Sequence, residues 1–316
     1  MSETYPGQEH RWLETDTALA HAHEREPLGE PASVWKQAWR RMRRRPLTWV
    51  CLLILAVALA AAAFPDLLAA ADPTACELTR SMGQPVSGHP FGFDRQGCDI
   101  YARVVWGARA SLTVGFATTF VVTLIGVSLG AWAGMRGGWV DTIVSRLTDI
   151  VFALPLILAA IVVMEVLATH RSVWGVVAVM AAFGWPNITR ITRGVVMSVK
   201  NNDYVLAATA AGASRWRVLT RHILPNAAAP IIVYATLALG TFIVLEATLS
   251  FLGVGLPPDV ISWGSDIAAA QSTLRSRPLV LAYPALALAL TVLSVIILGD
   301  VARDALGVDE TGKEAS

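Results

Sequence analysis

The segment YVLAATAAGASRWRVLTRHILPN, at residues 204–226, lies between two apolar runs of the chain. It carries three arginines and one histidine but no acidic residue, and a glycine interrupts it. The flanking runs are near the roughly 20 residues that a helix needs to cross about 30 Å of hydrocarbon. The segment is therefore predicted to be a short basic connection between two membrane helices, where such a protein can touch a soluble partner.

The composition of the whole chain fits a membrane protein with several helices. Of its 316 residues, 54% are hydrophobic and only 16% are charged, which is far from the average of soluble domains. Because a charged group at the centre of a membrane helix costs about 2.5 to 3.5 kcal/mol, uncharged runs mark the spans. We therefore predict an all-α polytopic fold with six transmembrane helices, at residues 47–64, 110–135, 150–167, 172–189, 223–259 and 278–299.

Basic residues in the connections predict the orientation, because lysine and arginine collect on the cytosolic side. Six precede the first span between positions 36 and 45, and six more lie between 190 and 221. With six spans, a cytosolic N-terminus places the C-terminus and both basic clusters in the cytosol. We therefore predict that both termini are cytosolic. The predicted parts are a disordered cytosolic tail (1–32), a basic interfacial helix (33–45) anchored by Trp35 and Trp39, a first membrane helix (46–70), an extracytoplasmic segment (71–109), a core (110–308) with the cytosolic segment 203–226, and a cytosolic tail (309–316). A cleavable signal peptide ending near residues 69–71 is the alternative, although its polar leader is long.

The three cysteines divide by location. Cys51 lies in the first apolar run and is predicted to act as a small apolar residue. Cys76 and Cys98 fall in the predicted external segment, where an oxidising compartment permits a disulfide between them. Two free thiols remain the alternative, and no metal site is expected because no second cysteine pair accompanies them.

The basic segment divides into two short predicted helices. Asp203 is expected to cap the first, Gly212 to end it, and Ser214 to cap the second. The alanines of the first helix leave a low surface that another protein can approach, and Pro225 marks the entry to the fifth span. The alternative is a basic interfacial helix that binds only lipid headgroups.

The order of residues in this segment resembles the coupling motif of bacterial ABC-importer permeases. The pattern is AA-x3-G-x9-H-x-LP, here at Ala207, Ala208, Gly212, His222, Leu224 and Pro225. Four further stretches resemble the second permease of dipeptide and oligopeptide importers: HPFGFDRQGCDIYARVVWGARASL (89–112), GGWVDTIVSRLTDIVFALP (137–155), EATLSFLGVGLPPDVISWG (246–264) and GDVARDALGV (299–308). The resemblance covers about residues 33–308. It departs from the family at Leu206, where a glutamate is usual, and at Cys98, where an arginine is usual.

The resemblance implies a fold like that of type I ABC-importer permeases and a role in ATP-driven import of di- or oligopeptides across a bacterial inner membrane. It implies ATPase coupling through Ala207, Ala208, Gly212, Ala213, Ser214, Arg215, Trp216, Arg217, His222, Leu224 and Pro225. The implied partners are a second, homologous permease, one or two ATPase subunits, an extracytoplasmic substrate-binding protein and membrane lipid, but no nucleic acid. Because the chain has no Walker A pattern, ATP and magnesium are expected on the partner ATPases. The chain itself is expected to be no enzyme, with no catalytic residue and no cofactor.

Other functions stay open at this stage. Permeases for nickel chelates or for glutathione share the same motifs. A secondary transporter would need ionisable residues near the middle of the membrane, and only Glu246 is available. This carboxylate either lies in the substrate pathway, where it could contact a peptide amino group, or lies near the external boundary in a structural role.

Overall fold

The computed structural model describes residues 34–307, and its regular elements in that range are all helical. Four helices are long and apolar enough to cross a membrane, and a fifth span is present if the bent pair α6–α7 is counted as one. The four are α3 (Pro46–Ala63), α5 (Ile100–Arg136), α12 (Leu224–Phe251) and α14 (Pro278–Leu306). The bent pair is α6 (Gly138–Phe152) and α7 (Leu156–Val166), at 76° to each other. The predicted all-helical membrane fold is confirmed.

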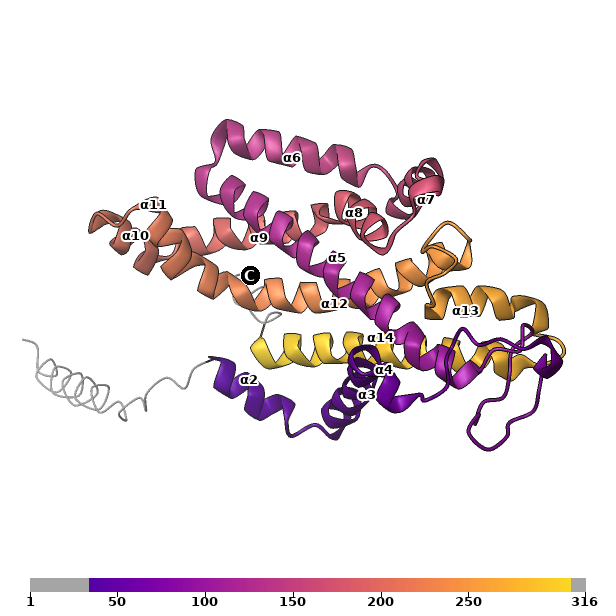
Figure 1. The fold of residues 1–316 in the computed structure, drawn as a ribbon. Helices are drawn as coiled ribbons and strands as arrows, with labels where there is room; N and C mark the ends of the chain where they lie inside the picture. The colour runs from indigo at the N-terminus through magenta and orange to yellow at the C-terminus, as the bar shows by residue number, and fades with distance from the viewer. Residues whose placement is uncertain (1–33, 308–316) are drawn as a thin grey trace, which may run out of the picture.

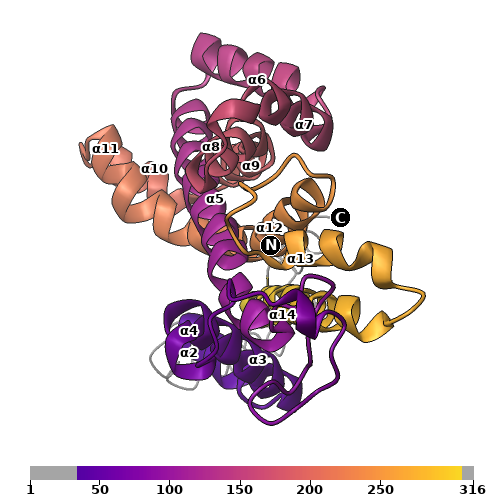
Figure 2. The same cartoon turned by 45° about the vertical axis from the view of Figure 1, so that its right-hand side comes forward.

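Shorter helices join these spans (Figures 1 and 2). They are α2 (Val34–Met42), α4 (Pro65–Leu68), η1 (Leu78–Arg80), η2 (Ala168–His170), α8 (Val173–Gly184), α9 (Pro186–Lys200), α10 (Asp203–Ala210), α11 (Arg215–Val218), η3 (Leu219–Ile223), α13 (Trp263–Ala270) and η4 (Gln271–Thr273). In Figure 1, α10 and α11 lie at one end of the bundle, and α13 and the segment before α5 lie near the other. The tails predicted at 1–32 and 309–316 lie outside the described residues.

The third and fourth predicted spans have different boundaries in the structure. The apolar run 150–167 is broken between α6 and α7, because Pro155 has no backbone N–H and disfavours a helical residue before it. The run 172–189 corresponds to α8, which has only 12 residues. Trp185 keeps a right-handed helical backbone and leads directly into α9. The run 150–167 is therefore interrupted by a bend, whereas the run 172–189 continues through Trp185 into α9.

Other boundaries also shift. α3 ends at Ala63 and not near 70, and α5 begins at Ile100 and not at 110. The early start of α5 follows from Asp99, whose side chain accepts hydrogen bonds from the backbone N–H groups of Tyr101 and Ala102. The segment between α3 and α5 therefore spans residues 64–99, where 71–109 was predicted. α12 ends at Phe251, so the run 223–259 closes with a loop.

Close helix contacts hold the bundle together. Gly126, Gly130 and Gly134 form a stripe along α5 that faces α9. A Cβ at Gly130 would lie 2.6 Å from the carbonyl oxygen of Thr189, and one at Gly134 would lie 2.8 Å from a methyl carbon of Val196. Only glycine permits this approach of two helices, which is a common packing mode in membranes. On the same helix, Gly115 lies against Ile243 of α12.

Two hydrophobic clusters form most of the core. The larger joins α5, α7, α8, α9 and α12, with Val114, Met164, Met180, Ile188 and Phe242 among its buried members. The second joins α3, α5, α12 and α14 around Trp263. In the irregular segment before α5, Cys76 and Cys98 are joined by a disulfide, and Cys51 is a buried free thiol.

Candidate functional site

The basic segment folds into a compact unit, which we call the basic hairpin (residues 203–223: α10, α11 and η3). Gly212 ends α10 with a φ of +84°, a conformation that favours glycine. Its N–H donates to the Thr209 carbonyl at 3.0 Å, and the next N–H, of Ala213, donates to Ala208 at 3.1 Å. Ser214 caps α11 as predicted, since its hydroxyl accepts from the N–H of Arg217 at 3.3 Å. The predicted cap by Asp203 is wrong.

The position of Asp203 has a simple physical account. α10 begins at Asp203 itself, and Asn202 before it makes no side-chain cap. The carboxylate is thus in the first turn, where it interacts favourably with the positive end of the helix dipole. Only the role of Asp203, and not the existence of the helix, differs from the prediction.

Apolar side chains fix the basic hairpin to the bundle. Val205, Val218 and Ile223 are each at most 4% exposed. They form one cluster with Ala131 of α5 and Val196 of α9. The hairpin is therefore anchored on the ends of two core helices and cannot move independently of them without exposing this cluster.

The opposite face of the hairpin is exposed and has an unusual composition. Trp216 is 73% exposed, and Tyr204 and Leu206 are 44% and 54% exposed. Within residues 34–307, the neighbouring Arg215, Arg217 and Arg221 form no ion pair. Of the other predicted coupling residues, Ala207, Gly212, Ser214 and Pro225 are exposed and Ala208, Ala213, His222 and Leu224 are half-buried. Much of the motif is thus exposed, and its exposed side chains include both apolar and cationic groups.

The basic hairpin continues into a membrane helix without a loop. Residues 215–251 form one helical stretch, in which η3 is a π-helical turn just before α12. Pro225 is the second residue of α12 and cannot donate to a preceding carbonyl, which accounts for the wider turn before it. A displacement of the hairpin must therefore move α12 as well.

Glu246, the one acidic residue of α12, is fully buried. The hydroxyl of Ser111, on α5, donates to one of its carboxylate oxygens at 2.9 Å, and that of Ser250 donates to the other at 2.8 Å. Ser111 in turn accepts from the backbone N–H of Trp263, at the start of α13, at 3.2 Å. The carboxylate of Glu246 therefore links α12 to α5 and, through Ser111, to α13. These contacts favour a structural role of Glu246 over contact with substrate.

Replacing Glu246 with alanine should destabilise the protein by about 2 to 4 kcal/mol, because it leaves two buried hydroxyls without their acceptor and opens a cavity. Glu246→Gln keeps one acceptor oxygen and a similar volume, so it should lose less than half as much. Thermal unfolding of the protein in detergent would measure both. Glu165→Ala, which removes a 66% exposed carboxylate paired with Arg171, is the control and should change little. Equal melting temperatures for Glu246→Ala and wild type would contradict the network.

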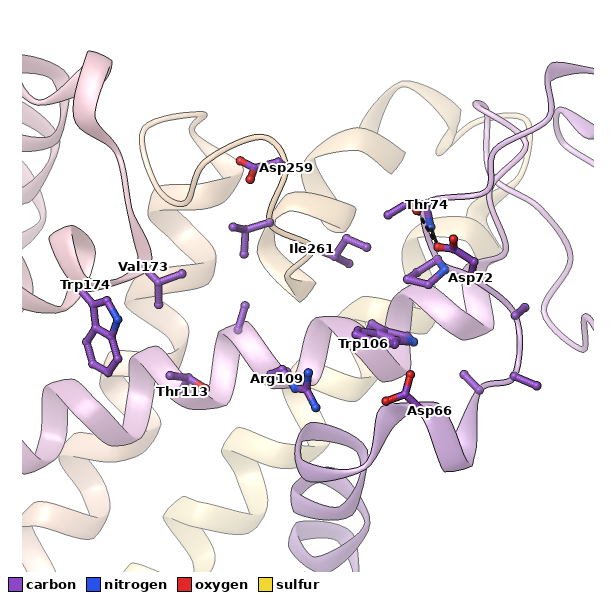
Figure 3. A pocket seen from close by; sticks show the side chains of 16 residues that line it. Asp66, Asp72, Thr74, Trp106, Arg109, Thr113, Val173, Trp174, Asp259 and Ile261 are labelled. Atoms are coloured by element: carbon purple, nitrogen blue, oxygen red, sulfur yellow. Dashed lines mark hydrogen bonds between the residues drawn. The ribbon is translucent and has the colours of Figure 1, made fainter.

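A cavity of about 1040 Å³ opens near the other end of the molecule (Figure 3). Its walls come from the chain after α3, from α5, from the start of α8 and from the loop before α13. Arg109 of α5 donates to the carbonyls of Ala62 and Ala63 at 2.9 and 3.2 Å, so it satisfies the C-terminal end of α3. The sequence did not reveal this cavity, because its residues lie far apart in the chain.

A partly buried ion pair connects α13 to α5 and lines a second, smaller cavity of about 560 Å³. The guanidinium of Arg103 donates from Nε to Asp266 at 2.9 Å and makes a second, shorter contact from Nη2. Burial raises the pKa of Asp266 to about 6, although Arg103 lowers it; the charge of Asp94 raises it further. The other oxygen of Asp266 has no hydrogen-bond partner within residues 34–307. This carboxyl group therefore titrates well above an ordinary aspartate.

The raised pKa predicts a specific pH dependence of stability. Because the unfolded side chain titrates near 3.8, the folded protein binds more protons than the unfolded chain between pH 3.8 and about 6. The stabilisation is complete below pH 3.8 and is lost as the pH rises through about 6, with a slope of up to about 1.4 kcal/mol per pH unit. Between pH 3.8 and about 6, the free energy of unfolding of the wild type should therefore fall with rising pH relative to that of Asp266→Asn. Melting temperatures of the two proteins across this window would measure the difference. If the melting temperatures of the two proteins changed in parallel with pH, the raised pKa of Asp266 would be contradicted.

Comparison with known proteins agrees with this architecture. The family described as "Binding-protein-dependent transport system inner membrane component" matches residues 126–307, which include the basic hairpin, α12 and α14. The chain belongs to this family. A second family model, the N-terminal transmembrane domain of oligopeptide transport permease C, matches residues 33–85.

Several relatives of the family are similar over nearly their whole length. The oligopeptide transport system permease protein OppC of Bacillus subtilis is 37% identical over 292 residues, which are 92% of this chain and 95% of that protein. The glutathione transport system permease protein GsiD of Pectobacterium atrosepticum is 36% identical over 273 residues, or 86% and 90% of the two chains. In an inward-facing structure of the MetNI methionine ABC transporter, one chain has a TM-score of 0.53, at 19% identity over 64% of this chain and 96% of that one. The last likeness concerns the fold alone. As a member of the family, this chain is a multi-pass membrane subunit and not a catalytic one.

Proposed function

We propose that this chain is the permease subunit of an ATP-driven importer of di- or oligopeptides. The similarity to the oligopeptide and dipeptide permeases OppC and DppC, at 37% and 35% identity over 92% and 87% of the chain, supports the substrate class. The observation that carries the transport role is the exposed apolar and cationic face of the basic hairpin. In the proposal, a soluble partner covers these exposed side chains.

In this proposal the partner is an ATPase subunit that binds nucleotide and magnesium. Trp216 and Leu206 would enter a groove of that subunit, and Arg215 and Arg217 would meet acidic groups at its rim. Closure of two ATPase subunits on ATP would then displace the hairpin and, with it, α12. Because Leu206 stands where the motif usually has a glutamate, the proposed contact is more apolar here than in permeases with that glutamate.

The remaining partners follow from the same class of importer. A second, homologous permease would complete the translocation pathway, and one or two ATPase subunits would bind the nucleotide. A substrate-binding protein would dock at the end that carries α13 and the disulfide. This arrangement puts the basic hairpin and both termini in the cytosol, in agreement with the two clusters of basic residues.

Glutathione is the second candidate substrate. It is supported by several permeases named GsiD, one of them 37% identical over 89% of this chain. Glutathione is itself a small peptide, so both candidates require the same kind of pathway. The binding protein that accompanies this permease would decide between them.

Purification of the tagged chain in mild detergent tests the proposal. We expect a second permease, ATPase subunits with Walker motifs and ATP hydrolysis in the same preparation. Uptake of labelled dipeptide in cells, with unlabelled glutathione or oligopeptide as competitors, would then rank the substrates. A chain that purifies alone and transports without ATP would refute the proposal.

A further inference from the structure

α2 is held against the bundle in a fixed orientation. It packs on α14, with Ala38 only 3% exposed. Just after the helix, Arg45 donates from Nη1 to Asp304 of α14 at 2.9 Å. The indole N–H of Trp49 donates to the carbonyl of Arg43 at 3.1 Å and so holds the turn into α3. These contacts fix the orientation of α2, and with it the direction in which its exposed side chains point.

One outward face of α2 is strongly basic. Gln37, Arg40 and Arg41 follow the spacing of one helix face, and Arg44 continues it in the next turn. These four side chains line a shallow cavity of about 210 Å³. Among residues 34–307, Arg40, Arg41 and Arg44 have no carboxylate partner. Three close cationic groups repel one another, and an anion between them would relieve this repulsion.

Aromatic side chains occupy another face of the same helix. Trp35 and Trp39 are 47% and 50% exposed. With 3.6 residues per turn, they lie on the side opposite to Arg40 and Arg41. A helix with tryptophans on one face and arginines on the other lies in the membrane interface, where anionic lipids increase its binding.

We propose that Arg40, Arg41 and Arg44 bind the phosphodiester headgroups of anionic phospholipids. Guanidinium groups match phosphate oxygens in bidentate geometry, whereas a zwitterionic headgroup adds a cation that opposes the contact. Each basic residue near an anionic surface contributes about fivefold in affinity, so the three together should contribute about a hundredfold. The contact would steady α14 through the ion pair of Arg45 with Asp304. This inference does not depend on the transported substrate.

The test is a lipid titration of the full chain in detergent. Short-chain phosphatidylglycerol should raise the melting temperature by several degrees, while phosphatidylcholine of the same chain length and inorganic phosphate should not. In R40Q/R41Q/R44Q the midpoint of the phosphatidylglycerol effect should rise about a hundredfold. The control R215Q/R217Q/R221Q loses the same charge from the basic hairpin and should respond like wild type. An equal rise with phosphatidylcholine, a rise with inorganic phosphate alone, or an unchanged response of R40Q/R41Q/R44Q would overturn the proposal.

Two measurements keep the test decisive if the glutamine variant does not fold. R40K/R41K/R44K retains the positive charges and should keep a response within about tenfold of wild type. For the wild-type chain, 1 M salt reduces the screening length to about 3 Å and should largely abolish the difference between the two lipids. A difference that persists in 1 M salt would also overturn the proposal.

Discussion

Replacing Gly130 with leucine is expected to prevent the chain from reaching its native bundle. A Cβ at this position would lie 2.6 Å from the carbonyl oxygen of Thr189 and 2.8 Å from the Cβ of Thr192. The first of these atoms is backbone, so α9 as a whole would have to move away from α5. Overpacking costs about 1 to 3 kcal/mol where side chains can adjust, and we expect at least about 3 kcal/mol here. The yield of monodisperse protein in detergent and its melting temperature would measure the loss.

Gly194 supplies a matched control on the other helix of this contact. A Cβ at Gly194 meets no atom within 4 Å, so Gly194→Leu adds the same side chain to α9 at an open position. We expect wild-type yield and a melting temperature within a few degrees. If Gly130→Leu behaved like Gly194→Leu, the close contact between α5 and α9 would be absent from the purified protein.

Replacing Gly212 with tryptophan should reduce ATP-dependent uptake at least about tenfold while leaving the chain in the membrane. No atom lies within 4 Å of a Cβ at Gly212, so the first atom of the new side chain meets open space. The side chain projects from the exposed face of the basic hairpin, where the proposed ATPase would bind. Its positive φ adds roughly 1 to 2 kcal/mol of local strain. Uptake by cells, compared at equal amounts of membrane-inserted protein, is the measurement.

Gly212→Asn separates the two causes of this effect. Asparagine tolerates a positive φ better than other residues and is much smaller than tryptophan. It should therefore retain most of the uptake and the co-purifying ATPase. Wild-type uptake by Gly212→Trp at equal expression would refute the role of this surface, and equal losses in both variants would attribute the effect to the backbone.

Much of the fold could be predicted from hydrophobic runs, because the cost of charge in hydrocarbon limits where spans can lie. This logic correctly located α3, α12 and α14 and the all-helical class, whereas the resemblance of the motifs indicated the family of folds. It failed at α6 and α7, where the charges of residues 138–149 lie on a helix that is bent at Pro155 and not in a loop. The local capping by Asp99 also lengthened α5 in a way that hydropathy does not report.

The candidate site was predictable where its residues are contiguous. The order of small, cationic and proline residues between 204 and 226 predicted the two helices and the turn at Gly212. By contrast, Ser111, Glu246 and Trp263 come together only through packing, and no spacing in the sequence indicates the contact. The partly buried pair of Arg103 and Asp266 was missed for the same reason.

The continuity of residues 215–251 has a mechanical consequence. At 1.5 Å per residue these 37 residues form a rod roughly 55 Å long. The contact of Ile243 with Gly115 lies roughly 42 Å from the start of the rod and roughly 12 Å from its end. If the rod turns about this contact, a movement of the basic hairpin reaches Phe251 reduced to about 0.3 of its size, and the force there is about 3.5-fold larger. A wide motion at one side of the membrane would then become a short, forceful one at the other, beside the three helices that Glu246 holds together.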